Sequence, residues 1–113
     1  MNTSEIVLVR FPFSTLESEK KRPALVLNNV KLTSKISLHT IAMITSKIDG
    51  IKLDGDILLN GWKESGLLHP SLLRLSKIAT IEQELITKIL GKLTSSDEKV
   101  VKKAFSTLFK HWS

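Results

Sequence analysis

Apolar and polar residues alternate along several short segments of this chain, and this pattern predicts a protein built mainly of β-strands. Residues 5–11 carry apolar side chains on both faces of such a strand. On one face lie Ile6 and Leu8, and on the other lie Val7 and Val9. We therefore expect this strand to be central in its sheet and covered on both sides.

Further strands are expected wherever alternation resumes between turn residues. The predicted segments are residues 22–27, 38–45, 56–59, 71–81 and 86–93. Pro23 suits the first position of its strand, and Asn28-Asn29 weakens the pattern that follows. Asn60-Gly61 predicts a turn, residues 82–85 one helical turn, and Gly91 a break in the last strand.

The C-terminal segment has helical rather than strand periodicity. Ser95 and Glu98 have the spacing of a capping box, which predicts the start of a helix. The apolar stripe that follows consists of Val101, Ala104, Phe105, Leu108 and Trp112. We expect Trp112 to continue this stripe and to pack on the sheet or on a dimer partner. With no repeat or linker, residues 1–113 are interpreted as one domain, a small barrel-like sheet with one packed helix.

Charge and composition narrow the cellular setting and the class of partner. The formal net charge is +6 with a pI near 9.7, and the chain has no cysteine. The tight basic run Lys20-Lys21-Arg22 would attract phosphate backbones or acidic proteins. The lack of cysteine, of a signal-peptide pattern and of a long apolar stretch predicts a cytoplasmic protein with no membrane partner.

Three segments at strand–loop junctions carry candidate chemistry. They are Phe11-Pro12-Phe13 with the loop to Pro23, Thr45-Ser46-Lys47, and His69-Pro70-Ser71 followed by Arg74. Such junctions let a rigid sheet hold a reacting group at a loop-lined surface.

Five stretches in order resemble the MazF/PemK family of endoribonuclease toxins and cover nearly the whole chain: residues 5–13, 21–27, 44–46, 70–74 and 90–93. One departure is Ser4-Glu5, where the family commonly has Gly-Asp before the first strand. The resemblance implies an SH3-like antiparallel β-barrel of the CcdB/MazF/PemK type with a C-terminal α-helix. It also implies a homodimer, single-stranded RNA in the dimer groove, and an antitoxin whose acidic, apolar tail fills the same groove.

The resemblance further implies cleavage of mRNA without a metal or other cofactor. The ribose 2′-oxygen attacks and leaves a 2′,3′-cyclic phosphate, with Arg22 and Thr45 as the catalytic residues. A guanidinium suits this role because its donor fork matches phosphate oxygens. His69 could carry the proton, since arginine is a poor base. The expected RNA-binding residues are Phe13, Lys20, Lys21, Ser46, Lys47, Ser71 and Arg74.

Alternatives stay open at this point. Arg22 could be a surface charge, Thr45 and Ser46 ordinary strand-end residues, and Ser71 a turn cap. Asp54 and Asp56 fit a turn better than a metal site. His39 is expected to be half-exposed on a strand, and His111 to lie in the final helical turn. The fold would also suit a non-catalytic CcdB-like toxin that binds DNA gyrase, or a non-toxic RNA-binding regulator.

Overall fold

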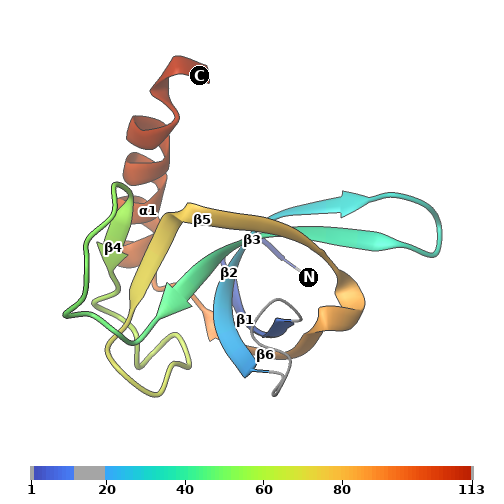
Figure 1. Ribbon diagram of the computed structural model, residues 1–113, viewed down its shortest axis with the longest axis horizontal. Coiled ribbons are helices and arrows are strands. Elements are labelled where there is room, and N and C mark those ends of the chain that lie inside the picture. Colours follow the sequence, from blue (N-terminus) through green and yellow to red (C-terminus); the bar gives the residue numbers. More distant parts are fainter. Residues whose placement is uncertain (1, 12–19, 113) are drawn as a thin grey trace.

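One antiparallel sheet of six strands organises the computed structural model, which describes residues 2–11 and 20–112. The strands are β1 (Glu5–Phe11), β2 (Lys20–Lys31), β3 (Ser37–Thr45), β4 (Asp56–Leu58), β5 (Leu72–Glu82) and β6 (Ile86–Lys92). A 3₁₀ turn, η1 (Gln83–Leu85), joins β5 to β6, and helix α1 (Ser95–Leu108) and a second 3₁₀ turn, η2 (Lys110–Trp112), follow. The strand order β4-β5-β3-β2-β1-β6 curls into a half-open barrel, with α1 beside β4 (Figure 1). This confirms the expected mainly β fold with a C-terminal helix.

Alternation along the strands divides the interior into two apolar clusters, one on each face of the sheet. On β1, Ile6 belongs to the cluster that α1 covers, whereas Val7 and Val9 belong to the cluster that the curl encloses. All three are fully buried, and β1 lies between β2 and β6. The prediction of a central strand with two covered faces is therefore confirmed.

Strand β2 is longer at both ends than the sequence pattern predicted. It begins at Lys20, so Pro23 lies inside the strand and not at its first position. Proline has no N–H group to donate to a neighbouring strand. It is tolerated here because Pro23 is paired with Leu8 of β1 only, and regular pairing with β3 starts one residue later, at Ala24. Beyond Leu25, the pair Asn28-Asn29 stays in the strand by pairing with β3 after a register shift.

The last strand, β6, continues through Gly91, where a break was expected. A Cβ atom at Gly91 would fall on the carbonyl oxygen of Ser65, and one at Gly66 would fall on the carbonyl oxygen of Leu90. Gly66 also has φ +90°, a conformation that favours glycine. The two glycines thus allow the connection between β4 and β5 to press its backbone against β6.

The helix begins one residue earlier than the capping box predicted. Thr94 is the N-cap, and its hydroxyl accepts a hydrogen bond from the Asp97 amide at 3.2 Å. The buried Asp97 carboxylate accepts from the amides of Asn60 and Gly61 at 3.2 and 2.8 Å. The predicted Asn60-Gly61 turn is therefore anchored to the first turn of α1.

Trp112 does not pack on the sheet, the first of its two expected positions, and its packing on a dimer partner stays a prediction. Helix α1 ends at Leu108, and Trp112 lies in η2 with 90% of its surface exposed. His111 belongs to the same 3₁₀ turn and not to the final turn of the helix. The end of α1 projects past the sheet, so that the last part of the stripe has no strand beneath it (Figure 1).

No helix in the described part of the chain is long and apolar enough to cross a membrane.

The expectation that His39 is half-exposed is also wrong, because only 2% of its surface is accessible. Its Nδ1 lies 2.7 Å from Asn29 Oδ1 and its Nε2 lies 3.3 Å from Gln83 Oε1. These amides come from β2 and η1, which the curl of the sheet brings to either side of the ring. A polar side chain can be buried here because both ring nitrogens have partners.

The turn before β1 contains Ser4, where the family pattern described above commonly has a glycine. Ser4 has φ +71°, in the left-handed region that favours glycine. The Ser4 amide donates a hydrogen bond to the Val26 carbonyl of β2, and the Ser4 carbonyl accepts one from the amide of Leu93, the residue after β6. Hydrogen bonding from Ser4, with a smaller effect of Lys102, lowers the pKa of Glu98. The turn therefore keeps a glycine-like backbone with a serine in it.

We expect Gly66→Ala to destabilise the protein by at least about 2 kcal/mol, because it adds both a left-handed alanine and a clash with Leu90 O. Thermal unfolding should show a drop in Tm of about 10 °C. Gly50→Ala is the matched control, since its Cβ would come no closer than 3.9 Å to Lys47 O. Equal melting of the two variants would contradict the close backbone packing described above.

Candidate functional site

A pocket of about 710 Å³ lies where β2 begins and β3 ends. It collects most of the site residues predicted from sequence, from three segments far apart in the chain. These lining residues are Lys20, Lys21, Arg22, Thr45, Ser46, Lys47, His69 and Ser71. The sequence segments singled out as candidate chemistry therefore meet at one place.

The floor of the pocket is a row of side chains that crosses the sheet. Leu8 of β1 pairs with Pro23 of β2 on one side and with Lys88 of β6 on the other. The β2–β3 register pairs Ala24 with Met43, and continuing it by one step places Pro23 opposite Ile44. All four members of this row line the pocket. Its middle is apolar, and its β6 end carries a cation.

Continuing the same register by one further step places Arg22 opposite Thr45. Cross-strand residues in this relation have Cβ atoms about 4.5–5.5 Å apart in a regular sheet. Both residues are half-buried and both line the pocket. Arg22 and Thr45 therefore lie on neighbouring strand ends at the pocket.

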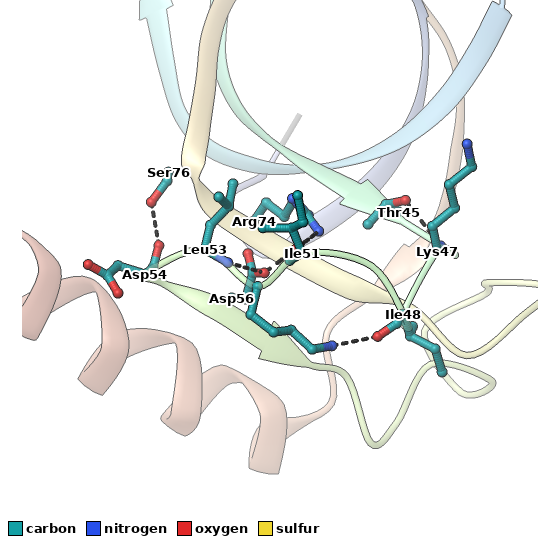
Figure 2. A network of polar contacts seen from close by, with 10 residues as sticks. Thr45, Lys47, Ile48, Ile51, Leu53, Asp54, Asp56, Arg74 and Ser76 are labelled. Carbon is teal, nitrogen blue, oxygen red and sulfur yellow. Dashed lines mark hydrogen bonds and ion pairs between the residues drawn. The ribbon is translucent and has the colours of Figure 1, made fainter.

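Local backbone contacts orient these two side chains. Arg22 pairs with Val9 of β1, and the following Pro23 keeps its backbone extended. Thr45 Oγ1 accepts a hydrogen bond from the Lys47 amide at 3.1 Å, as Figure 2 shows. Because that oxygen is held as an acceptor, its own proton can be donated into the pocket.

The end of the connection between β4 and β5 also lines the pocket. Leu67 is buried, whereas Leu68 and His69 are exposed on the pocket side. The Ser71 hydroxyl donates to the His69 carbonyl at 2.8 Å, so Ser71 caps this turn. Its single proton is already used, and Ser71 could only accept a hydrogen bond from a ligand.

The pocket is strongly cationic. Its charged side chains are Lys20, Lys21, Arg22, Lys47 and Lys88, and none of the described lining residues is Asp or Glu. Sequence reasoning missed Lys88 and Leu68. Lys88 stands in an ordinary polar stretch of β6, and only its pairing with Leu8 brings it to the row.

Arg74 is separated from this pocket. Its Nη2 donates to the Ile51 carbonyl at 2.8 Å and lies 3.8 Å from Asp56 Oδ2 (Figure 2). The same carboxylate oxygen accepts from the Leu53 amide at 2.9 Å. Arg74 therefore holds the loop between β3 and β4, and we leave it out of the proposed ligand-binding set.

Three residues considered in the sequence analysis, Phe13, Asp54 and Asp56, are not part of the described pocket lining. Phe13 lies outside the described residues. Asp54 accepts at its backbone carbonyl from the Ser76 hydroxyl, and Asp56 is used as above, so both act in the turn before β4 (Figure 2). In residues 2–11 and 20–112, no group of three or more His, Asp or Glu side chains is arranged to hold a metal ion.

Comparison with solved structures finds the same architecture in bacterial toxins. The toxin MazF-mt6 of Mycobacterium tuberculosis aligns with a TM-score of 0.71 at 22% identity, over 94% of this chain and 96% of that one. An endoribonuclease from a mycobacterial species, solved with its cognate antitoxin, aligns with a TM-score of 0.70 at 12% identity, over 95% and 92%. At these identities the similarity establishes the fold.

Sequence comparison establishes the family. No curated protein sequence gives a significant match. A profile of the "PemK-like, MazF-like toxin of type II toxin-antitoxin system" family, however, matches residues 2–109. Because this match spans almost the whole domain, the chain belongs to the PemK-like, MazF-like family of type II toxins.

Proposed function

We propose that this protein is an endoribonuclease toxin that cuts single-stranded RNA in the cytoplasm without a metal ion. The observation that carries the proposal is the placement of Arg22 and Thr45 on neighbouring strand ends in one cationic pocket. Family membership points the same way, since solved relatives include a protein described as an endoribonuclease.

The proposed reaction is a transfer of the phosphoryl group within the RNA. The 2′-oxygen attacks the adjacent phosphorus, the bond to the 5′-oxygen breaks, and the products are a 2′,3′-cyclic phosphate and a free 5′-hydroxyl. Negative charge builds on the non-bridging oxygens during this step. The Arg22 guanidinium and the Thr45 hydroxyl supply donors to those oxygens, which stabilises the transition state.

The proton on the attacking 2′-hydroxyl needs an acceptor, and the leaving 5′-oxygen needs a donor. Among the described lining residues, His69 carries the imidazole, a group that can both accept and donate a proton. It is exposed and lines the same pocket as the strand ends. We therefore assign proton transfer to His69, with Arg22 acting electrostatically.

The remaining lining residues fit a polyanion and a protein inhibitor equally well. Lys20, Lys21 and Lys47 would hold RNA phosphates, and the Ser46 hydroxyl could donate to one. The same cations around an apolar floor suit an acidic, apolar antitoxin segment, and one structural neighbour was solved with its cognate antitoxin. We further propose a homodimer, in which the pocket opens toward the groove between the two copies.

Replacing Arg22 by alanine should lower the cleavage rate of a single-stranded RNA by about 10²–10³-fold, because a pre-positioned donor to the phosphate is lost. Arg22→Lys should recover little, since it lacks the planar fork. EDTA should leave the wild-type rate unchanged. The rate is measured by gel analysis of a labelled RNA, with circular dichroism as the check on folding. Full activity of a folded Arg22→Ala variant would remove Arg22 from the mechanism.

If His69 accepts the proton, His69→Gln should lose about 10²-fold or more of the cleavage rate, because the glutamine amide cannot accept it. Gel analysis of a labelled RNA measures the rate of both proteins, with circular dichroism as the check on folding. A folded His69→Gln variant with the wild-type rate would show that another group moves the proton.

The exposure of Trp112 supports one alternative function, that of a non-catalytic toxin that binds another protein. A side chain 90% exposed at the end of a projecting helix is typical of a contact with another protein, which a non-catalytic, gyrase-binding toxin would need. Under our proposal, deleting residues 112–113 should leave the RNA cleavage rate unchanged, because Trp112 does not line the pocket. Growth inhibition in cells and cleavage in vitro are measured together. Loss of toxicity with cleavage intact would favour the binding protein.

A further inference from the structure

Lys88 lies at the far end of the row that forms the pocket floor. The row runs from Lys88 of β6 through Leu8 and Pro23 to Ile44 of β3. Three steps between neighbouring strands, each about 4.8 Å, put the β6 end about 14 Å from the β3 end. Lys88 therefore extends from the end of the floor opposite Thr45, on a strand that bears neither Arg22 nor Thr45.

The ammonium of Lys88 has no ion-pair partner in the described part of the chain. It shares the pocket with Lys20, Lys21 and Arg22, and the described lining holds no carboxylate. Like charges gathered around one cavity repel one another, and this repulsion is relieved when an anion binds among them. The position of Lys88 thus indicates an anion at the β6 end of the floor.

Between the two ends the floor cannot hold a phosphate. Leu8 and Pro23 form its middle, and Leu67 and Leu90 line the adjoining wall. None of these side chains can donate a hydrogen bond. An apolar surface of this kind suits the face of an unpaired base.

We infer that Lys88 binds a second phosphate of the substrate, so that the RNA strand crosses β2, β1 and β6 with its unpaired bases over Leu8 and Pro23. This inference rests on the proposed ribonuclease function and deepens it. It assigns a path to the bound strand, with the scissile phosphate at the β2–β3 end. It also makes Lys88 a substrate-binding residue of this pocket.

The test compares Lys88→Gln with Lys31→Gln, a matched loss of one exposed lysine at the far end of β2, outside the pocket. The site cleaved by the wild-type protein is mapped first on a long RNA. A short 2′-O-methyl analogue of that site, which cannot be cut by 2′-oxygen attack, then serves as the binding probe. Fluorescence anisotropy gives the Kd at several salt concentrations, and cleavage assays give kcat and KM.

Lys88→Gln should weaken binding by about tenfold and reduce the steepness of log K against log salt by about 0.7, the value for one phosphate contact on a single strand. KM should rise in the same proportion while kcat stays near the wild-type value, because the scissile phosphate lies elsewhere. Removing the bases between the two phosphates should also weaken binding. Lys31→Gln should change none of these quantities.

Two failures are distinguishable. If the wild-type protein neither cuts nor binds RNA, the proposed function falls, and the inference falls with it. If the wild-type protein cuts RNA but Lys88→Gln and Lys31→Gln have the same salt dependence and KM, the inference alone is overturned. A fall in kcat with an unchanged KM would equally overturn it, because Lys88 would then act on the reacting phosphate.

Discussion

Backbone packed directly on backbone at Gly66 and Gly91 is the contact on which the site depends. A side chain at either position would collide with a carbonyl oxygen of the other segment. Because neither has one, the backbone of the connection between β4 and β5 packs against β6. The same connection contributes Leu68 and His69 to the pocket that the strand ends bearing Arg22 and Thr45 also line.

The acidic residues explain how a pocket without carboxylates arises in the described structure. Asp97 is buried and holds the amides of Asn60 and Gly61, while Asp56 holds the Leu53 amide beside Arg74. Glu98 interacts with Ser4 and Lys102 near the start of α1. These negative charges are used as structural acceptors away from the pocket, which leaves the lysines and Arg22 around its floor unopposed. The described lining of the pocket is therefore positively charged.

Sequence periodicity predicted the strands well where an apolar residue faced each side of the sheet, as in β1, β3 and β5. It failed where a contact made elsewhere in the chain decided the outcome. The pair Asn28-Asn29 stays in β2 because β3 pairs with it, and His39 is buried because Asn29 and Gln83 reach its ring. Trp112 continues the helical stripe in sequence but lies in η2, beyond the sheet that the stripe packs against.

The sequence by itself determined the mainly β fold, the terminal helix and three of the segments that line the pocket, because alternation, turn residues and the five family-like stretches are local signals. Tertiary structure decided which of those residues share the pocket. Strand register brings Lys88 to the floor, and a hydrogen bond to Ile51 with an ion pair to Asp56 takes Arg74 away from it. Register and side-chain partners join residues distant in the chain, so no local pattern of residues can specify them.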